Sequence, residues 1–200
     1  MAGDTIDVGF EGRHGQTLAG RLHLPAGQVR ACALFAHCFT CSKDLNAVVR
    51  IGRALAQEGI ATLRFDFTGL GRSGGDFADT SVSGNVDDVL SAADWLRAHH
   101  GVPALLVGHS LGGAAVLLAA GQVPDAVAVA TIGAPCDPAH VRHLLRDDEA
   151  ALRAHGEAVV DIGGRPFRLR RELLDDLERH DPAAAIRGMG KALLILHSPQ

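Results

Sequence analysis

Five short and almost uninterrupted apolar runs recur along this 200-residue sequence, and they limit what it can fold into. The runs cover Ala31–Ala36, Ala61–Phe67, Ala104–Val107, Val127–Ile132 and Ala192–Leu196. Apolar runs of this length are typical of parallel strands that are covered on both faces. Stretches with helical character fall between them: Leu45–Glu58, Val82–His99 and Leu111–Ala120. The alternation predicts an α/β fold with a doubly wound, mostly parallel sheet.

The start of the chain follows a different pattern. Thr5–Phe10 and Thr17–Leu24 alternate polar and apolar residues around a turn that contains Gly12 and Gly15, which predicts an antiparallel hairpin ahead of the parallel sheet. With 47% hydrophobic residues, 200 residues can bury one sizeable core and are too few to indicate two. We therefore expect residues 1–200 to form a single domain.

Charge and hydropathy argue against several classes of partner. The formal net charge is -4, from 19 basic and 23 acidic residues without a basic block, which disfavours a nucleic-acid or anionic-membrane partner. The N-terminus lacks a basic segment followed by an apolar stretch, and no apolar run approaches the length that spans a bilayer. We expect a cytoplasmic protein that acts on a small molecule.

The interval between the fourth and fifth apolar runs is unusually long. Charged helical patterns occupy it, and Val159–Leu169 predicts a hairpin that turns at Gly163 and Gly164. A segment inserted here would lie beside the carboxyl ends of the strands, where ligands bind in open α/β sheets. We interpret residues 137–190 as a lid, with additional surface packing as the alternative.

The most specific motif lies between the third apolar run and the helix that follows it. Residues 108–112 are Gly-His-Ser-Leu-Gly, so Ser110 is at the centre of a G-x-S-x-G pattern between a strand and a helix. Such a serine sits on a strained turn, where flanking glycines let neighbouring backbone approach without a Cβ clash. Free N–H groups at the helix start favour the negative oxygen formed when an acyl carbonyl is attacked. We predict that Ser110 is the nucleophile of an acyl hydrolase; the alternative is a glycine-rich turn with an incidental serine.

A hydrolase of this kind needs a second oxyanion donor from the loop after an earlier strand. The segment His37-Cys38-Phe39-Thr40 follows the first apolar run. The backbone N–H groups of Phe39 and Leu111 are therefore the predicted oxyanion donors, and each such donor is typically worth about a hundred- to a thousand-fold in turnover. The chemistry would pass through an acyl-enzyme and needs no cofactor.

Three segments resemble successive signatures of the α/β-hydrolases: His37–Asp44, Arg64–Ser73 and Gly108–Gly113. More narrowly, the chain resembles the hydrolase half of bacterial proteins in which this domain is fused to an OsmC-like, peroxide-reducing domain. Feruloyl-esterase-like and serine-aminopeptidase-type hydrolases are its wider relatives, and Ile162–Phe167 resembles part of their lid. The resemblance implies the α/β-hydrolase fold, a carboxylic ester or related acyl substrate, and an OsmC-like domain as a fused or associated partner.

Cys38 and Cys41 depart from this pattern, because most such hydrolases have glycine at these positions. A C-x-x-C pair between a strand and a helix is also typical of thioredoxin-like redox sites. A helix start lowers the pKa of a thiol and so favours its reactive thiolate. The alternative to a hydrolase is therefore a redox or non-catalytic α/β module that serves a peroxide-reducing domain. For the two cysteines themselves, the alternative is that they are loop residues without a redox role.

The catalytic partners of Ser110 are expected in the chain order Ser, then Asp or Glu, then His. The resemblance places the acid just after Ala192–Pro199 and the histidine after one further strand, so that both would lie beyond the end of the sequence. We therefore expect the last strand and helices of the fold to be missing here and the hydrolase activity to be nearly abolished. Asp137 with His140 and His143 is an alternative acid and base in the right order, but neighbouring residues at one helix start are poorly placed to reach the nucleophile.

Two further patterns have structural explanations. Gly69–Gly74 matches the G-x-G-x-x-G fingerprint of dinucleotide-binding sites, but a loop follows it where a helix should begin. We expect it to form a tight loop at the rim of the active site, with Arg64 and Asp66 paired to hold it. The eleven histidines include no set with metal-ligand spacing, so neither a metal nor a cofactor is expected.

Overall fold

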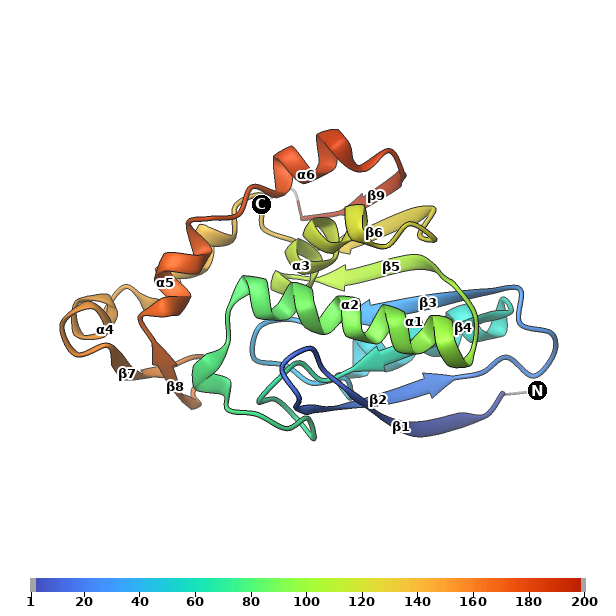
Figure 1. Ribbon diagram of the computed structural model, residues 1–200, viewed down its shortest axis with the longest axis horizontal. Coiled ribbons are helices and arrows are strands. Elements are labelled where there is room, and N and C mark those ends of the chain that lie inside the picture. Colours follow the sequence, from blue (N-terminus) through green and yellow to red (C-terminus); the bar gives the residue numbers. More distant parts are fainter. Residues whose placement is uncertain (1–2, 199–200) are drawn as a thin grey trace.

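The computed structural model describes residues 3–198, except for the side chain of His140. Within this part, seven strands form the main sheet: β1 (Thr5–Glu11), β2 (Thr17–His23), β3 (Ala31–Ala36), β4 (Ile60–Phe65), β5 (Pro103–His109), β6 (Ala128–Ile132) and β9 (Ala192–Leu196). Their order across the sheet is β1-β2-β4-β3-β5-β6-β9. The pairs β1–β2 and β2–β4 are antiparallel and the others are parallel (Figure 1). The predicted mostly parallel sheet with an N-terminal antiparallel hairpin is confirmed.

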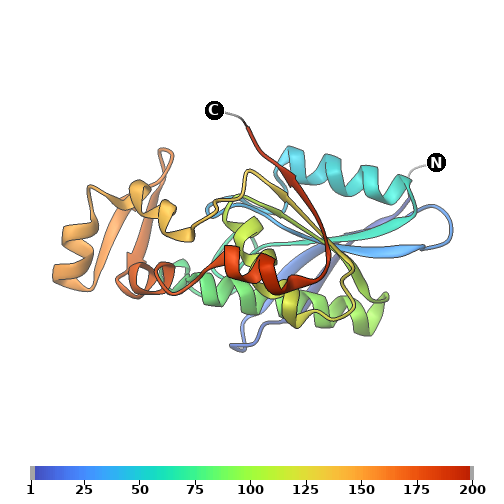
Figure 2. The same cartoon turned by 90° about the horizontal axis from the view of Figure 1, so that it is seen from above.

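Helices cover both faces of this sheet. Figure 2 shows α1 (Asn46–Gln57) on one face, and α2 (Val82–His99), α3 (Leu111–Ala119) and α6 (Pro182–Met189) on the other. Helix α2 begins after Ser81, whose hydroxyl oxygen accepts a hydrogen bond from the Gly84 N–H. This N–H is one of those at the helix start that have no partner within the helix. The first three helices begin and end within about one residue of their predicted bounds.

The core forms around the parallel strands because apolar side chains project from both of their faces. Leu34 of β3 and Leu106 of β5 belong to a large buried cluster together with residues of α2 and α3. Phe35 and Val107, one position further along the same strands, pack with Val48 of α1 on the opposite face. This alternation is the physical reason that the central strands are apolar at every position.

A long segment connects β6 to β9. It contains η3 (Pro138–Leu145), α4 (Glu149–His155), the strands β7 (Glu157–Asp161) and β8 (Pro166–Arg170), α5 (Glu172–Leu177) and then α6. Strands β7 and β8 form the predicted hairpin, and both Gly163 and Gly164 in its turn have positive φ, which glycine adopts without strain. The hairpin lies beyond the end toward which β3 and β5 point, on the left in Figure 1.

Strand β9 differs from the prediction that each apolar run is covered on both faces. Leu194, Ile195 and Leu196 are 54%, 56% and 49% exposed. Among the described residues, β9 is an edge strand that pairs with β6 on one side. Leu193 still packs against the main core, but the described part of the chain leaves most of β9 uncovered.

Truncation of Leu106 should show that the central strands carry the stability of the fold. Leu106 is fully buried in β5, and Leu106→Ala should lower the free energy of unfolding by about 2–5 kcal/mol, because it removes buried methyl groups and leaves a cavity. Val127, directly before β6, is 67% exposed. Val127→Ala should therefore change the free energy of unfolding by less than about 0.5 kcal/mol. Urea unfolding followed by circular dichroism measures both variants, and equal losses would contradict this placement of the core.

Candidate active site

Ser110 forms the whole connection between strand β5, which ends at His109, and helix α3, which begins at Leu111. Its backbone has φ 54° and ψ -126°, and within residues 3–198 it is the one residue other than glycine with a positive φ. A positive φ costs free energy in a residue that carries a side chain, and such strain concentrates at functional sites. The strained turn that the sequence motif predicts is present in the structure.

Glycines allow α3 to begin in direct contact with the ends of two strands. A Cβ at Gly108 would overlap the carbonyl oxygen of Gly112, and a Cβ at Gly112 would overlap the carbonyl oxygen of His37. Because these overlaps are with backbone atoms, no side-chain movement relieves them. The close approach places the end of β3, and the loop that follows it, beside the start of α3.

Three polar groups around this turn have no hydrogen-bond partner among the described residues. They are the hydroxyl of Ser110 and the backbone N–H groups of Phe39 and Leu111. Leu111 is the first residue of α3, where a helix leaves its N–H groups unpaired. The N–H of Ser110, by contrast, donates to the carbonyl oxygen of Ile132 at 2.9 Å. Neighbouring segments thus offer a free hydroxyl and two free donors.

The loop after β3, residues 37–44, carries Phe39 in a tight turn, and we call it the β3 loop. The N–H of Cys41 donates to the carbonyl oxygen of Cys38 at 3.2 Å, and a disulfide joins the same two residues. The Phe39 ring is buried, with its centroid 5.4 Å from that of Phe77. Cys38 and Cys41, expected from the sequence to be thiols, are bonded to each other in the structure.

A buried carboxylate fastens the β3 loop to the end of β4. Asp66 is fully buried and accepts hydrogen bonds from the Lys43 N–H at 2.7 Å, the Lys43 ammonium at 2.6 Å and the Arg72 N–H at 3.0 Å. Lys43 is only 2% exposed, so water barely reaches this ion pair. A Cβ at Gly71, where φ is 55°, would overlap the Asp66 carboxylate. Asp66 therefore holds both the β3 loop and the glycine-rich loop at residues 69–74.

The predicted pairing of Arg64 with Asp66 is wrong. Asp66 is satisfied by Lys43, and the Arg64 guanidinium instead donates to the Lys43 carbonyl oxygen and, at 2.8 Å, to the Asp44 carboxylate. It also donates to Nε2 of His23 at 2.9 Å. Burial and the neighbouring Arg64 charge lower the pKa of His23 to about 4, which leaves this nitrogen unprotonated and able to accept. The two buried charges, Arg64 in β4 and Asp66 just after it, thus both support the β3 loop.

Among the described side chains, no histidine forms a hydrogen bond with the Ser110 hydroxyl. His37 is fully buried, with Nδ1 2.7 Å from the Cys38 carbonyl oxygen and Nε2 accepting from the Phe67 N–H at 3.4 Å. Burial lowers the pKa of His37, and both of its ring nitrogens are engaged, so it is not placed to take a proton. Nδ1 of His109 is buried without a partner in the described part of the chain. The side chain of His140 lies outside the described residues, so the alternative base there stays a prediction.

The β7–β8 hairpin lies against the β3 loop and the 3-10 helix η1 (Phe77–Asp79). The Arg165 guanidinium donates to the Thr40 carbonyl oxygen, and the ring centroid of Phe167 lies 4.9 Å from that of Phe77. Two exposed ion pairs connect β8 to residues at η1: Arg168–Asp76 and Arg170–Asp79. The segment inserted between β6 and β9 therefore touches the loop that carries Phe39.

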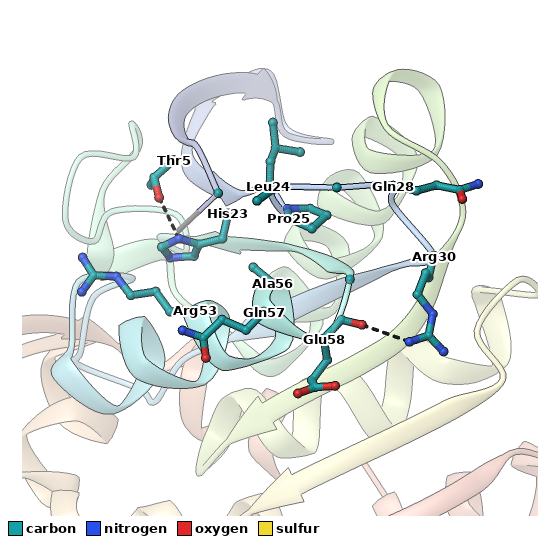
Figure 3. Close-up of a pocket in the computed structure, with 14 residues that line it drawn as sticks. Thr5, His23, Leu24, Pro25, Gln28, Arg30, Arg53, Ala56, Gln57 and Glu58 are labelled. Atoms are coloured by element: carbon teal, nitrogen blue, oxygen red, sulfur yellow. Dashed lines mark hydrogen bonds between the residues drawn. The ribbon is translucent and has the colours of Figure 1, made fainter. Parts of the chain in front are cut away.

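A large cavity lies at the opposite end of the sheet. It has a volume of about 800 Å³ and lies between the β2–β3 connection and the end of α1 (Figure 3). Thr5 and His23 line it, with 2.9 Å between the Thr5 hydroxyl and Nδ1 of His23. The residues around it precede β3 and β4, whereas Ser110 follows β5. The cavity is thus separate from the candidate active site.

The described residues offer neither a metal centre nor a membrane-spanning helix. Within residues 3–198 no group of three or more His, Cys, Asp or Glu side chains is arranged to hold a metal ion. In the same range no helix is both long enough and apolar enough to cross a membrane.

The sheet order, the helices on both faces and the strand-turn-helix connection at Ser110 together define an α/β-hydrolase fold. The serine aminopeptidase S33 family (Hydrolase_4) matches residues 27–167. The esterase domain of a Rhodothermus marinus protein is 52% identical, with a TM-score of 0.76, and the match covers 98% of this chain and 77% of that one. The chain therefore belongs to the Hydrolase_4 family of α/β-hydrolases.

More distant solved structures share the fold. Est1E from Butyrivibrio proteoclasticus, solved with ferulic acid bound, is 24% identical with a TM-score of 0.80, over 95% of this chain and 78% of that one. An esterase from Pyrococcus furiosus is 16% identical with a TM-score of 0.68, over 96% of this chain and 69% of that one. At these identities the likeness concerns the fold alone. A search of curated proteins gives no significant match, and the OsmC-like partner stays a prediction.

Asp66→Asn should destabilise the protein, because the buried Lys43 ammonium would keep only its longer contact, 3.6 Å, with the half-exposed Asp44 carboxylate. Removing one partner of a buried ion pair typically costs about 3–5 kcal/mol, whereas replacing both partners is often close to neutral. The double variant Lys43→Met/Asp66→Asn should therefore recover most of the loss. Asp79→Asn, which breaks the exposed pair with Arg170, is the control and should cost less than about 1 kcal/mol. Thermal unfolding measures the stability of all three variants. A loss of stability in Asp66→Asn no larger than that in Asp79→Asn would contradict the anchoring role of Asp66.

Proposed function

We propose that this protein hydrolyses carboxylic esters or related acyl compounds with Ser110 as its nucleophile. The observation that carries the proposal is the Ser110 hydroxyl, held on a positive-φ turn at the start of α3 and without a hydrogen-bond partner among the described residues. An incidental serine has no need of this strain, whereas a nucleophile must stand clear of the sheet to reach a carbonyl carbon. The 52% identical Rhodothermus marinus chain, described as an esterase domain, supports the same class of reaction.

The oxyanion site in this proposal consists of the backbone N–H groups of Phe39 and Leu111. Attack on a carbonyl moves negative charge onto its oxygen, and donors without another acceptor can hold that charge without rearrangement. The Leu111 N–H lies at the positive end of the α3 dipole. The Phe39 N–H comes from the β3 loop, which the missing side chain at Gly112 allows to approach α3.

The reaction divides into two steps. The Ser110 oxygen attacks the acyl carbon, its proton passes to a base, the alcohol leaves and an acyl-enzyme remains; water then attacks the acyl carbon and releases the acid. In hydrolases of this fold the base is a histidine that an acidic residue orients. Both nitrogens of His37 are engaged, and no other described histidine side chain contacts the Ser110 hydroxyl. We propose that the acid and the histidine of the triad are not among the described side chains.

The competing assignment is a redox or non-catalytic α/β module associated with an OsmC-like domain. The Cys38–Cys41 disulfide favours it in one respect, because a redox module needs a pair of cysteines that can bond. A redox or non-catalytic module, however, does not explain the strained turn at Ser110 or the free N–H groups beside it. We therefore prefer the hydrolase, with the disulfide as part of its site; the OsmC-like partner rests on the sequence resemblance.

A fluorophosphonate probe should label Ser110 in the folded chain. The probe phosphonylates a serine that is held in an oxyanion site, so we expect slow, site-specific labelling, detected by mass spectrometry of the digested protein. Ser110→Ala should remove the label, and urea-unfolded protein should not acquire it. Ser83→Ala, which alters a surface serine bonded to Asp176, is the matched control and should label like the parent chain. Labelling that survives in Ser110→Ala would refute the assignment of the nucleophile.

Turnover of p-nitrophenyl acetate by the 200-residue chain should be close to the uncatalysed rate. Loss of the histidine base in a serine hydrolase lowers turnover by about a million-fold, and the activity that remains comes from the oxyanion site and from binding. A steady-state assay of the purified chain measures this. Fast turnover that Ser110→Ala abolishes would show that a base within residues 1–200 reaches Ser110, with the side chain of His140 as the first candidate.

A further inference from the structure

The disulfide between Cys38 and Cys41 closes the turn that carries Phe39. The turn has a single backbone hydrogen bond, from the Cys41 N–H to the Cys38 carbonyl oxygen, and the two Cα atoms are 5.3 Å apart. The side chains of His37 and Arg165 add hydrogen bonds to the carbonyl oxygens of Cys38 and Thr40. A short, partly exposed turn of this kind still opens at a lower cost in free energy than the core does. The covalent bond removes that freedom. Because Phe39 and Thr40 are the only residues that the ring encloses, the constraint acts directly on the backbone of the proposed oxyanion donor.

The two cysteines are more accessible than Phe39, one of the two residues between them. Cys38 and Cys41 are both partly exposed, whereas Phe39 is 7% exposed. An external thiolate can therefore reach the disulfide while the fold stays intact. The two remaining cysteines differ from this pair, because Cys32 is buried and Cys136 is an exposed free thiol. The disulfide is thus the accessible cysteine pair within the described residues.

The rest of the β3 loop is anchored without the disulfide. His37 is buried at the start of the loop, and near its other end Lys43 is bonded to Asp66 through both its backbone N–H and its ammonium. Breaking the sulfur bond would leave these anchors in place and free residues 38–41 between them. The expected change is therefore local: the Phe39 N–H loses its fixed direction while the sheet and α3 keep theirs.

A positive charge next to the pair favours thiol chemistry. The Arg165 guanidinium donates to the Thr40 carbonyl oxygen, inside the ring that the disulfide closes, and lies 5.1 Å from the centre of the Phe167 ring. No carboxylate among the described residues pairs with it. A nearby cation favours the thiolate form of a cysteine, which is both the attacking and the leaving species in disulfide exchange.

We propose that Cys38 and Cys41 form a reversible redox site that controls the hydrolase. The disulfide holds the Phe39 N–H in position to receive the oxyanion, and reduction releases it and slows acyl transfer. This inference rests on the function proposed above and adds a means of regulating the same site. The agent that acts on it is a dithiol reductant, with a small-molecule or protein disulfide as the oxidant that restores the closed form.

The exchange is balanced in two steps. One thiolate of the dithiol attacks a sulfur of the pair, the Cys38–Cys41 bond breaks, a mixed disulfide forms, and the displaced cysteine thiolate takes up a proton. The second thiolate of the reductant then attacks its own sulfur in the mixed disulfide. The reductant leaves as a cyclic disulfide, the second cysteine is released as a thiol, and two electrons and two protons have passed to the protein.

The test compares oxidised and dithiothreitol-reduced forms of the full 200-residue chain. Thiol titration of the folded protein should find one reactive thiol, Cys136, before reduction and three after it. Hydrogen exchange measured by mass spectrometry should rise at the hydrogen-bonded amide of Cys41 and stay unchanged in α3. The rate of fluorophosphonate labelling at Ser110 should fall by about tenfold, a part of the hundred- to thousand-fold that a whole oxyanion donor supplies.

Two variants separate this site from a general effect of the reductant. Cys38→Ser/Cys41→Ser should label at the slow rate of the reduced form and no longer respond to dithiothreitol, while Cys136→Ser should keep the full response. Circular dichroism checks that each form is folded.

Three results would overturn the proposal. The first is a labelling rate at Ser110 that reduction leaves unchanged or raises. The second is a disulfide that dithiothreitol reduces only when the protein unfolds. The third is no labelling of Ser110 in either form, which also counts against the proposed function, whereas the first two count against the redox control alone.

Discussion

Helix α3 starts in direct backbone contact with the ends of β3 and β5, and the geometry of the whole site depends on this contact. Gly108 and Gly112 leave the room for it, and the single-residue connection between strand and helix requires a positive φ at Ser110. Nearly every residue of α3 is buried, so the hydrophobic free energy of a whole helix opposes the strain at one residue. Core packing thus holds the reactive group in a conformation that a serine rarely adopts.

The two candidate oxyanion donors are held by different kinds of interaction. Leu111 is part of α3 and shares the rigidity of the core. Phe39 lies on the β3 loop, whose position depends on a buried ion pair between Asp66 and Lys43, on the Arg64 guanidinium and on a disulfide. Polar and covalent contacts can be altered one at a time, whereas core packing is lost only with the fold. The loop half of the site is therefore the half that can be adjusted without unfolding the protein.

Periodicity alone predicted most of the fold, because buried parallel strands and amphipathic helices leave different patterns; β3, α2 and β9 have the bounds that the sequence indicated. Motif context likewise predicted the turn at Ser110. The partner of Asp66 was not accessible to such reasoning, since Lys43 is 23 positions away and Arg64, two positions away, is the nearer candidate. A C-x-x-C pattern is the same whether its sulfurs are bonded or free. Likewise, an apolar run does not reveal whether another element covers it, as the exposed side chains of β9 illustrate.

Exposed arginine–aspartate pairs and one aromatic contact attach the β7–β8 hairpin to η1. Dissolved ions weaken the first kind of contact, since surface charges are screened beyond about 8 Å at physiological ionic strength and over shorter distances in concentrated salt. They do not weaken the packing of Phe167 on Phe77. In a saline medium the hairpin would therefore keep the packing of Phe167 and of its buried residues Val160 and Leu169, and its attachment along the charged edge would weaken. Its Arg165 contact with Thr40 would carry that freedom to the β3 loop, so the ionic composition of the surroundings would set how tightly this side of the protein is closed.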